Sequence, residues 1–156
     1  QKLSALVAAG HHLTAAEMVA HMQDTYRGFV RHNTPRFGEF FGHLLGSAEP
    51  TVFHCTAGKD RTGFAAALLL KAVGASDEEV MTDYLLTNDR LELPETSRMG
   101  LPREAMMVLW RVQPEFLQAA MEEVRAGYGS LEGYFRDGLQ LRDAERNALR
   151  RLYLAR

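Results

Sequence analysis

Hydrophobic residues recur at helical spacing through most of the chain. The first clear stripe follows a Thr-Ala-Ala-Glu capping box that begins at Thr14. It predicts a helix over about residues 15–31, and we expect its apolar face to lie in the core. Pro35 predicts a break, after which a second helix runs over about residues 36–45. The stripe consists of Met18, Met22, Tyr26, Phe29 and Val30.

One segment has the pattern of a strand instead. Residues 51–55 read Thr-Val-Phe-His-Cys after a proline, which is the short, β-rich apolar run of a buried strand. A compact loop containing Gly58 follows over residues 56–61. From Thr62 the chain is apolar nearly all round until Gly74, which predicts a buried helix closed by that glycine.

Further helices are predicted toward the carboxyl terminus, each from its own start signal. Ser76 opens a second capping box, Pro114 suits the first turn of a helix, and Ser130 is a favourable N-cap. Residues 87–102 contain two prolines and a glycine and predict a loop, and residues 1–13 carry only a weak helix start. The predicted helices run over about residues 76–86, 104–112, 114–126, 130–136 and 143–155.

These elements define an α/β chain that is rich in helix and has one strand. A buried strand needs neighbouring strands, because helices cannot pair its backbone N–H and C=O groups. Either further strands escape the pattern or the partner strands lie in sequence outside this chain. No repeat or domain boundary is visible, so residues 1–156 are expected to form a single domain.

Composition and charge narrow the function. The chain has 156 residues, of which 46% are hydrophobic and 24% charged, as in a globular protein. A net charge of −2 gives no general attraction to nucleic acid, and no apolar run reaches the ~20 residues of a membrane span. The single cysteine excludes an internal disulfide and a Cys-x-x-Cys site. The first residue is Gln1, so no targeting segment can be read, and cytoplasmic and secreted locations both stay open.

The candidate chemistry lies in residues 54–63, which read His-Cys-Thr-Ala-Gly-Lys-Asp-Arg-Thr-Gly. Cys55 and Arg61 flank five residues between the predicted strand and the predicted helix. Backbone N–H groups of such a loop can form a nest for an anion, and the helix that follows adds its positive end. The planar fork of Arg61 can grip two phosphoryl oxygens.

The same positive field acts on Cys55. Such surroundings lower the pKa of a thiol from about 8.5 to about 3.5–7.5, which makes the thiolate available at neutral pH. Phosphoryl transfer to sulfur followed by hydrolysis is then the natural reaction. The hydroxyl of Thr62 can assist departure of the sulfur, and the ring of His54 can hold the loop. The small residues Thr56, Ala57 and Gly58 allow the loop backbone to approach a phosphate closely.

Two loop residues have alternative roles. Lys59 is either a ligand for substrates with a second phosphate or a solvated lysine. Asp60 either protonates the leaving oxygen or pairs with a nearby cation. A nucleotide-binding P-loop is excluded, because Phe53 stands where its first glycine is required and Asp60 follows the lysine. A phosphate-binding or partner-binding module without turnover, and less favourably a sulfurtransferase, remain as alternatives.

The loop resembles the signature of the protein tyrosine phosphatase superfamily, and its full string resembles the bacterial and fungal branch. Residues 26–27, 83–88 and 128–135 are also similar to that branch, so the resemblance spans about residues 14–156. It implies that Cys55 is the nucleophile, that Arg61 binds phosphate and that Asp60 is the acid. It implies phosphotyrosine, phosphoserine or phosphothreonine, and phosphoinositide substrates, with no metal or organic cofactor.

The chain departs from this branch in one respect. Members carry an amino-terminal stretch with further strands and an Asp-Leu-Arg segment, which is not found here. The chain is therefore expected to be the carboxy-terminal portion of a longer catalytic domain.

Other polar residues have weaker claims to a function. His11, His12 and His21 lack the carboxylates or cysteines that would complete a metal site. Asp83 and Asn88 are either helix-surface and capping groups or supports for the loop. The sequence gives no oligomeric state.

Overall fold

The computed structural model describes residue 5, residues 12–92 and residues 100–154. All of its regular elements within these ranges are helices, and no strand occurs there. Most of the weak helix start in residues 1–13, the centre of the loop predicted over 87–102, and the last residue of the predicted final helix lie outside the described residues. The helix-rich part of the fold prediction is thus confirmed.

The first helix, α2, runs without interruption over Ala15–Gly46. The predicted break at Pro35 is therefore wrong. A proline removes one backbone hydrogen bond, but the same face of the helix is buried on both sides of Pro35, and this packing favours continuing the helix. Next to Pro35, the hydroxyl of Thr34 donates to the carbonyl of Val30 within the same helix at 2.6 Å.

The predicted helix starts agree well with the structure. Both capping boxes form: the hydroxyl of Thr14 accepts from the N–H of Glu17, and Ser76 does the same for Glu79. Part of the predicted 87–102 loop is helical, as α5. The remaining elements are α3 (Asp60–Val73), α4 (Asp77–Leu85), α5 (Thr87–Arg90), α6 (Arg103–Trp110), α7 (Pro114–Tyr128), α8 (Leu131–Gly133), the π-helical turn η1 (Tyr134–Gly138) and α9 (Asp143–Tyr153).

Residues 51–55 do not form the buried strand that their pattern predicts. They are non-helical and unpaired with any strand in the described ranges, and the side chain of Val52 is 91% exposed. An apolar run shows that burial is favourable, but a strand also needs a second strand for its N–H and C=O groups. That partner strands lie elsewhere in a longer domain stays a prediction.

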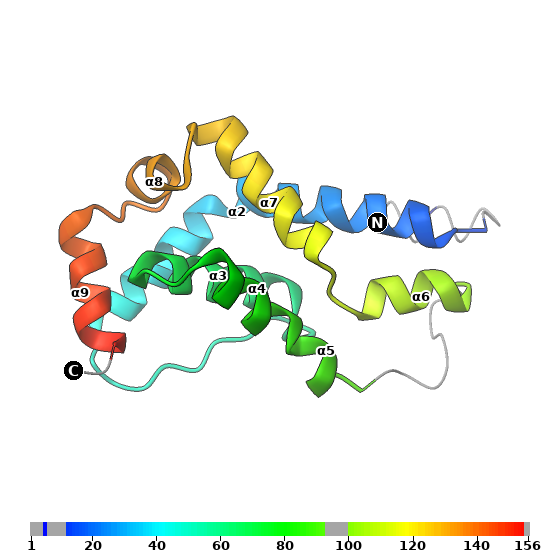
Figure 1. The fold of residues 1–156 in the computed structure, drawn as a ribbon, viewed down its shortest axis with the longest axis horizontal. Helices are drawn as coiled ribbons and strands as arrows, with labels where there is room; N and C mark the ends of the chain where they lie inside the picture. Colours follow the sequence, from blue (N-terminus) through cyan, green and yellow to red (C-terminus); the bar gives the residue numbers. More distant parts are fainter. Residues whose placement is uncertain (1–4, 6–11, 93–99, 155–156) are drawn as a thin grey trace.

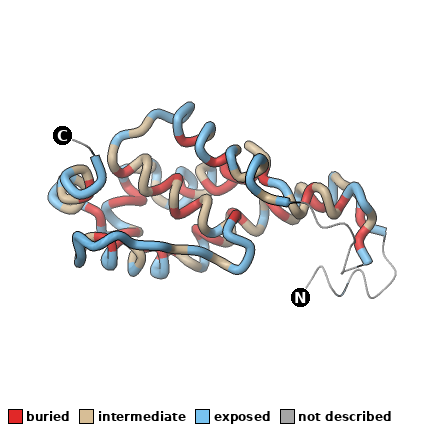
Figure 2. Tube along the Cα trace, turned by 90° about the horizontal axis from the view of Figure 1, so that it is seen from below, coloured by how far each residue is buried: buried red, intermediate tan, exposed pale blue. Residues whose placement is uncertain are grey.

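The helices pack around one hydrophobic core. The long helix α2 contacts α6 and α7, while α3 contacts α4 and α9. In Figure 1, α6 and α9 lie near opposite ends of the molecule, and the segment between α2 and α3 runs along an outer edge. Figure 2 shows buried positions along the inner sides of the helices. No helix in the described ranges is long and apolar enough to cross a membrane.

An aromatic cluster fixes α3 against α2. The ring of Phe64 on α3 lies 5.0 Å from Phe37 and 6.0 Å from Phe29, measured between centroids. Tyr26 and Phe29 on α2 are buried, as their stripe predicted. Since α3 begins at Asp60, within the last residues of the candidate loop, this cluster also determines where the loop lies.

Candidate active site

The loop between Cys55 and Arg61 is closed by hydrogen bonds at its base. The N–H of Cys55 donates to the hydroxyl of Thr62 at 2.9 Å, and the N–H of Gly58 donates to the carbonyl of Cys55 at 3.3 Å. Gly58 has a φ of 66°, a left-handed conformation that glycine adopts without strain. The loop ends in the first turn of α3, where the N–H of Gly63 donates to the carbonyl of Lys59 at 2.7 Å.

Cys55 is the focus of this loop. Partial burial raises the pKa of its thiol, but hydrogen bonds from the Thr62 hydroxyl and from the N–H groups of Thr62, Lys59 and Gly58 outweigh that effect. The pKa of Cys55 is lowered to about 7. About half of the Cys55 side chains are then thiolate at pH 7, which suits a nucleophile.

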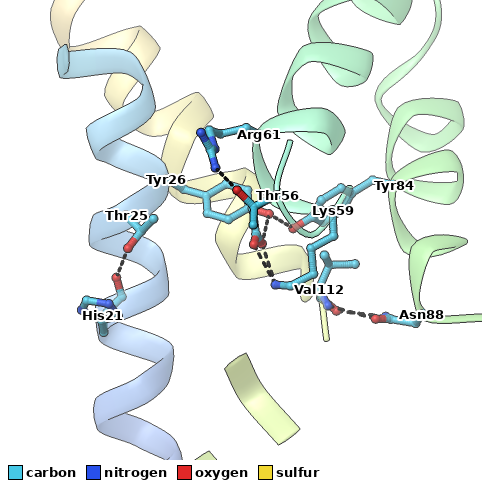
Figure 3. A network of polar contacts seen from close by, with 10 residues as sticks. His21, Thr25, Tyr26, Thr56, Lys59, Arg61, Tyr84, Asn88 and Val112 are labelled. Carbon is cyan, nitrogen blue, oxygen red and sulfur yellow. Dashed lines mark hydrogen bonds and ion pairs between the residues drawn. The ribbon is translucent and has the colours of Figure 1, made fainter. Parts of the chain in front are cut away.

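Arg61 and His54 lie on the exposed sides of the loop. The Nη2 atom of Arg61 donates to the hydroxyl of Thr56 at 3.3 Å, so its guanidinium reaches back across the loop (Figure 3). The Nδ1 atom of His54 lies 3.2 Å from the carbonyl oxygen of Cys55. With its hydrogen on Nδ1, His54 donates to that carbonyl and holds the loop.

A cleft of about 250 Å³ opens beside Cys55. One part of its wall is aromatic: the rings of Phe40 and Phe53 lie 4.7 Å apart between centroids. The other part carries the polar and charged groups of the loop and of α2. Its lining consists of Asn33, Arg36, Phe37, Phe40, Phe53, His54, Cys55, Arg61, Thr62 and Ala65. A cleft with this lining can admit an aromatic group that bears an anion.

Lys59 and Asp60 turn inward beneath the loop. The Nζ atom of Lys59 lies 2.8 Å from the carboxylate of Asp60, and the hydroxyl of Tyr26 donates to the same carboxylate at 3.0 Å. Lys59 is 4% exposed, so it is not a solvated lysine. Of the two readings of Asp60, the ion pair is present here, and its partner is Lys59. Neither residue is among those that line the cleft.

Two tyrosines complete this polar cluster from other helices. The hydroxyls of Tyr26 on α2 and Tyr84 on α4 lie 2.7 Å apart. Burial raises the pKa of Tyr26 far above its usual range, and the neighbouring Tyr84 and Asp60 raise it further. Burial also raises the pKa of Tyr84. Both hydroxyls therefore remain neutral at physiological pH.

Sequence reasoning missed several of these groups. Tyr26 was expected in the core, which is correct, but its hydroxyl also bonds Asp60. The available signal was a tyrosine within an apolar stripe, because a buried tyrosine usually needs a hydrogen-bond partner. Tyr84 lies in the segment 83–88 that resembles the phosphatase branch, but no role was assigned to it, and nothing in the sequence pattern indicated Arg36 or Phe40.

The remaining candidates lie apart from the loop. Asp83 is exposed, whereas Asn88 forms two hydrogen bonds with the backbone of Val112. His12 is exposed and His21 half-buried, and His11 is outside the described residues. Within the described ranges no three His, Cys, Asp or Glu side chains are grouped as a metal site would require.

Comparison with known proteins identifies the class to which this loop belongs. A family model described as the tyrosine phosphatase family matches residues 1–155. The chain therefore belongs to the tyrosine phosphatase family.

Two relatives are similar over most of the chain. A Cupriavidus necator protein, named provisionally as a tyrosine-protein phosphatase, is 37% identical over 151 residues, covering 91% of this chain and 53% of the relative. The triple specificity protein phosphatase PtpB of Mycobacterium tuberculosis is 38% identical over 136 residues, covering 75% of this chain and 49% of the relative. The chain thus spans about half the length of these relatives.

Proposed function

We propose that this protein hydrolyses phosphomonoesters with Cys55 as its nucleophile. The observation that carries the proposal is the setting of the Cys55 sulfur, which receives hydrogen bonds from loop N–H groups and from Thr62. The same N–H groups can bind phosphoryl oxygens, and Arg61 adds a positive charge beside them. The family to which the chain belongs supports this reaction class.

The reaction proceeds in two displacement steps. The Cys55 thiolate attacks phosphorus, an S–P bond forms, and the bond between phosphorus and the ester oxygen breaks. Loop N–H groups and Arg61 stabilise the equatorial oxygens of the transition state. Water then attacks the phosphocysteine, the S–P bond breaks, and phosphate leaves while the thiolate is regenerated. The Thr62 hydroxyl donates to the sulfur and stabilises the departing thiolate.

We propose that Asp60 is the general acid that protonates the leaving oxygen. Its side chain is 22% exposed and stands one residue before Arg61 in the first turn of α3. To protonate the leaving oxygen, Asp60 must turn from Lys59 and Tyr26 toward the cleft, which its side chain does not line in this structure. An Asp60→Asn variant should lose more activity on phosphotyrosine than on p-nitrophenyl phosphate, whose leaving group departs without a proton.

The cleft favours phosphotyrosine as the first substrate to test. Phe40 and Phe53 offer an aromatic wall, and Arg61 attracts a dianion, while the guanidinium of Arg36 is paired with Glu39. Phosphoserine, phosphothreonine and phosphoinositides are further candidate substrates of the same loop, and the relative PtpB is named a triple specificity phosphatase. Lys59 contacts a second phosphate only if it leaves Asp60, because it is buried against that carboxylate. The partners are thus phosphorylated proteins or phosphoinositides.

The decisive experiment measures phosphate release from p-nitrophenyl phosphate and a phosphotyrosine peptide in the presence of EDTA. Cys55→Ser should lower kcat by a factor on the order of 10⁴ or more, because the nucleophile is removed. Arg61→Ala should also lower turnover strongly. The matched control is Arg103→Ala, which removes another exposed arginine at the start of α6 and should leave turnover unchanged.

Three outcomes would contradict the proposal. Turnover that persists in Cys55→Ser would exclude the cysteine mechanism. A folded wild-type chain that binds the phosphotyrosine peptide without turnover would be a phosphate-binding module. Consumption of thiosulfate without phosphate release would indicate sulfur transfer.

A further inference from the structure

Two tyrosine hydroxyls and the Lys59–Asp60 pair form a directed hydrogen-bond chain beneath the loop. The Tyr26 hydroxyl donates to the Asp60 carboxylate at 3.0 Å. Since its single hydrogen is committed there, the contact of 2.7 Å between the tyrosines has Tyr84 as donor and Tyr26 as acceptor. Lys59 donates to the carboxylate from the other side at 2.8 Å. Figure 3 shows Tyr26 and Tyr84 approaching each other from two different helices, with Lys59 close by.

Three of the four residues in this hydrogen-bond network are deeply buried. Tyr26 is 0%, Tyr84 2% and Lys59 4% exposed. Among the described residues, no buried side-chain nitrogen or oxygen lacks a hydrogen-bond partner. Removing one hydroxyl would leave a buried neighbour unsatisfied, so each group holds the next in place.

One anchored residue, Lys59, also directs its backbone N–H to Cys55, and the other, Asp60, follows it directly in the chain. Lys59 and Asp60 stand where the loop becomes α3, and the N–H groups of Gly58, Lys59 and Thr62 bond the Cys55 sulfur. With both side chains fixed inward, the peptide groups on either side of Lys59 can no longer rotate freely. The tyrosines therefore act on the loop without touching the sulfur or the cleft.

Tyr84 adds a steric contact to this polar one. A Cβ atom at Gly63 would lie 3.1 Å from the ring of Tyr84, so the first turn of α3 packs directly on that ring. The ring of Tyr84 thus packs directly on this turn of α3, while its hydroxyl reaches the turn only indirectly, through Tyr26 and Asp60.

We propose that Tyr26 and Tyr84 are positioning residues of the phosphate loop, which through Asp60 and Lys59 hold the loop N–H groups in the orientation that Cys55 and a phosphoryl group require. The inference rests on the proposed function for its catalytic consequence. The structural part of the inference is that α2 and α4 hold the loop through Tyr26 and Tyr84. This part can be tested without an activity assay.

The test is the pH dependence of Cys55 alkylation by iodoacetamide in the intact chain. Cys55 is the single cysteine, so the reaction reports on one thiol. Wild-type protein should show a midpoint near pH 7. Tyr26→Phe should move this midpoint upward, toward the value of about 8.5 for a free thiol. Tyr84→Phe should move it less, because Tyr84 reaches Asp60 only through Tyr26.

The matched control is Tyr134→Phe. Tyr134 is likewise 0% exposed, and its hydroxyl bonds the Thr34 hydroxyl at 3.0 Å, away from the loop. This variant should lose stability comparably and leave the alkylation midpoint unchanged. In turnover assays, the Tyr26 and Tyr84 variants should lower kcat and weaken inhibition by inorganic phosphate, while the control does neither.

The result that overturns the inference is an alkylation profile of Tyr26→Phe and Tyr84→Phe that coincides with those of wild type and Tyr134→Phe. If Tyr26→Phe does not fold, Tyr84→Phe decides the question. A wild-type chain without phosphatase activity would contradict the proposed function but would leave the alkylation comparison valid, so the two failures are distinguishable.

Discussion

Thr62 holds Cys55 at both its backbone and its side chain. The Thr62 hydroxyl oxygen accepts the N–H of Cys55 at 2.9 Å, and its hydrogen is directed to the sulfur. The first bond fixes the start of the loop against α3, and the second stabilises negative charge on the sulfur. The Thr62 hydroxyl thus both fixes the conformation of the loop and lowers the pKa of the Cys55 thiol.

Replacing Thr62 should therefore make Cys55 less acidic. The folded pKa of about 7 lies below that of a free thiol, so the thiolate appears at lower pH than in the unfolded chain. Thr62→Ala should raise the pKa of Cys55 and reduce alkylation below pH 7, while Thr62→Ser should retain the wild-type profile. Measurement of the alkylation rate between pH 5 and 9 checks this, and identical profiles for Ala and wild type would rule it out.

Helix ends are determined by residues a few positions apart. The two capping boxes form because a β-hydroxyl and a glutamate satisfy each other's backbone N–H groups at the start of a helix. Gly74 ends α3 with a φ of 109°, and its N–H bonds the carbonyls of Leu70 and Lys71. Because α3 begins at the loop and ends at Gly74, its length was readable from local chemistry.

Two glycine substitutions should have opposite effects on stability. Gly74→Ala places a Cβ atom in the left-handed region and should lower the free energy of unfolding by about 1 kcal/mol. Gly42→Ala lies within α2 with no atom within 4 Å of the new Cβ, and should raise that free energy by about 0.5–1 kcal/mol. Urea unfolding followed by circular dichroism measures both, and equal signs for the two changes would contradict the argument.

At the scale of the whole molecule, one amide side chain joins two distant segments. The side chain of Asn88 on α5 donates to the carbonyl of Val112 and accepts its N–H, both at 2.9 Å. Val112 is 2% exposed and lies between α6 and α7. The Asn88 side chain thus satisfies the backbone N–H and C=O of Val112, which lies outside any helix.

Loss of this pairing should be costly. Asn88→Ala leaves a buried N–H and a buried C=O of Val112 without partners, and should lower the free energy of unfolding by about 2 kcal/mol or more. Asn147→Ala, which removes an exposed asparagine of α9, should change it by less than about 0.5 kcal/mol. Equal unfolding midpoints of the two variants in urea would show that the Asn88 pairing contributes little.

The sequence alone determined the features that depend on near neighbours. The helix starts, the glycine at the end of α3 and the spacing of Cys55 and Arg61 follow from residues within a few positions of each other. The continuity of α2 through Pro35 did not follow, because it depends on packing of both halves against other helices. The strand predicted at residues 51–55 failed for a related reason, since a strand exists only when another strand pairs with it.

Tertiary structure alone decided what lies beneath the loop. The sequence left Lys59 and Asp60 with two readings each, and Tyr26 and Tyr84 are 58 residues apart. Only the packing of α2 and α4 around the start of α3 brings these four groups together and buries Tyr26, Tyr84 and Lys59. The loop motif specifies which groups surround Cys55, while the helices that pack against it determine how firmly those groups are held.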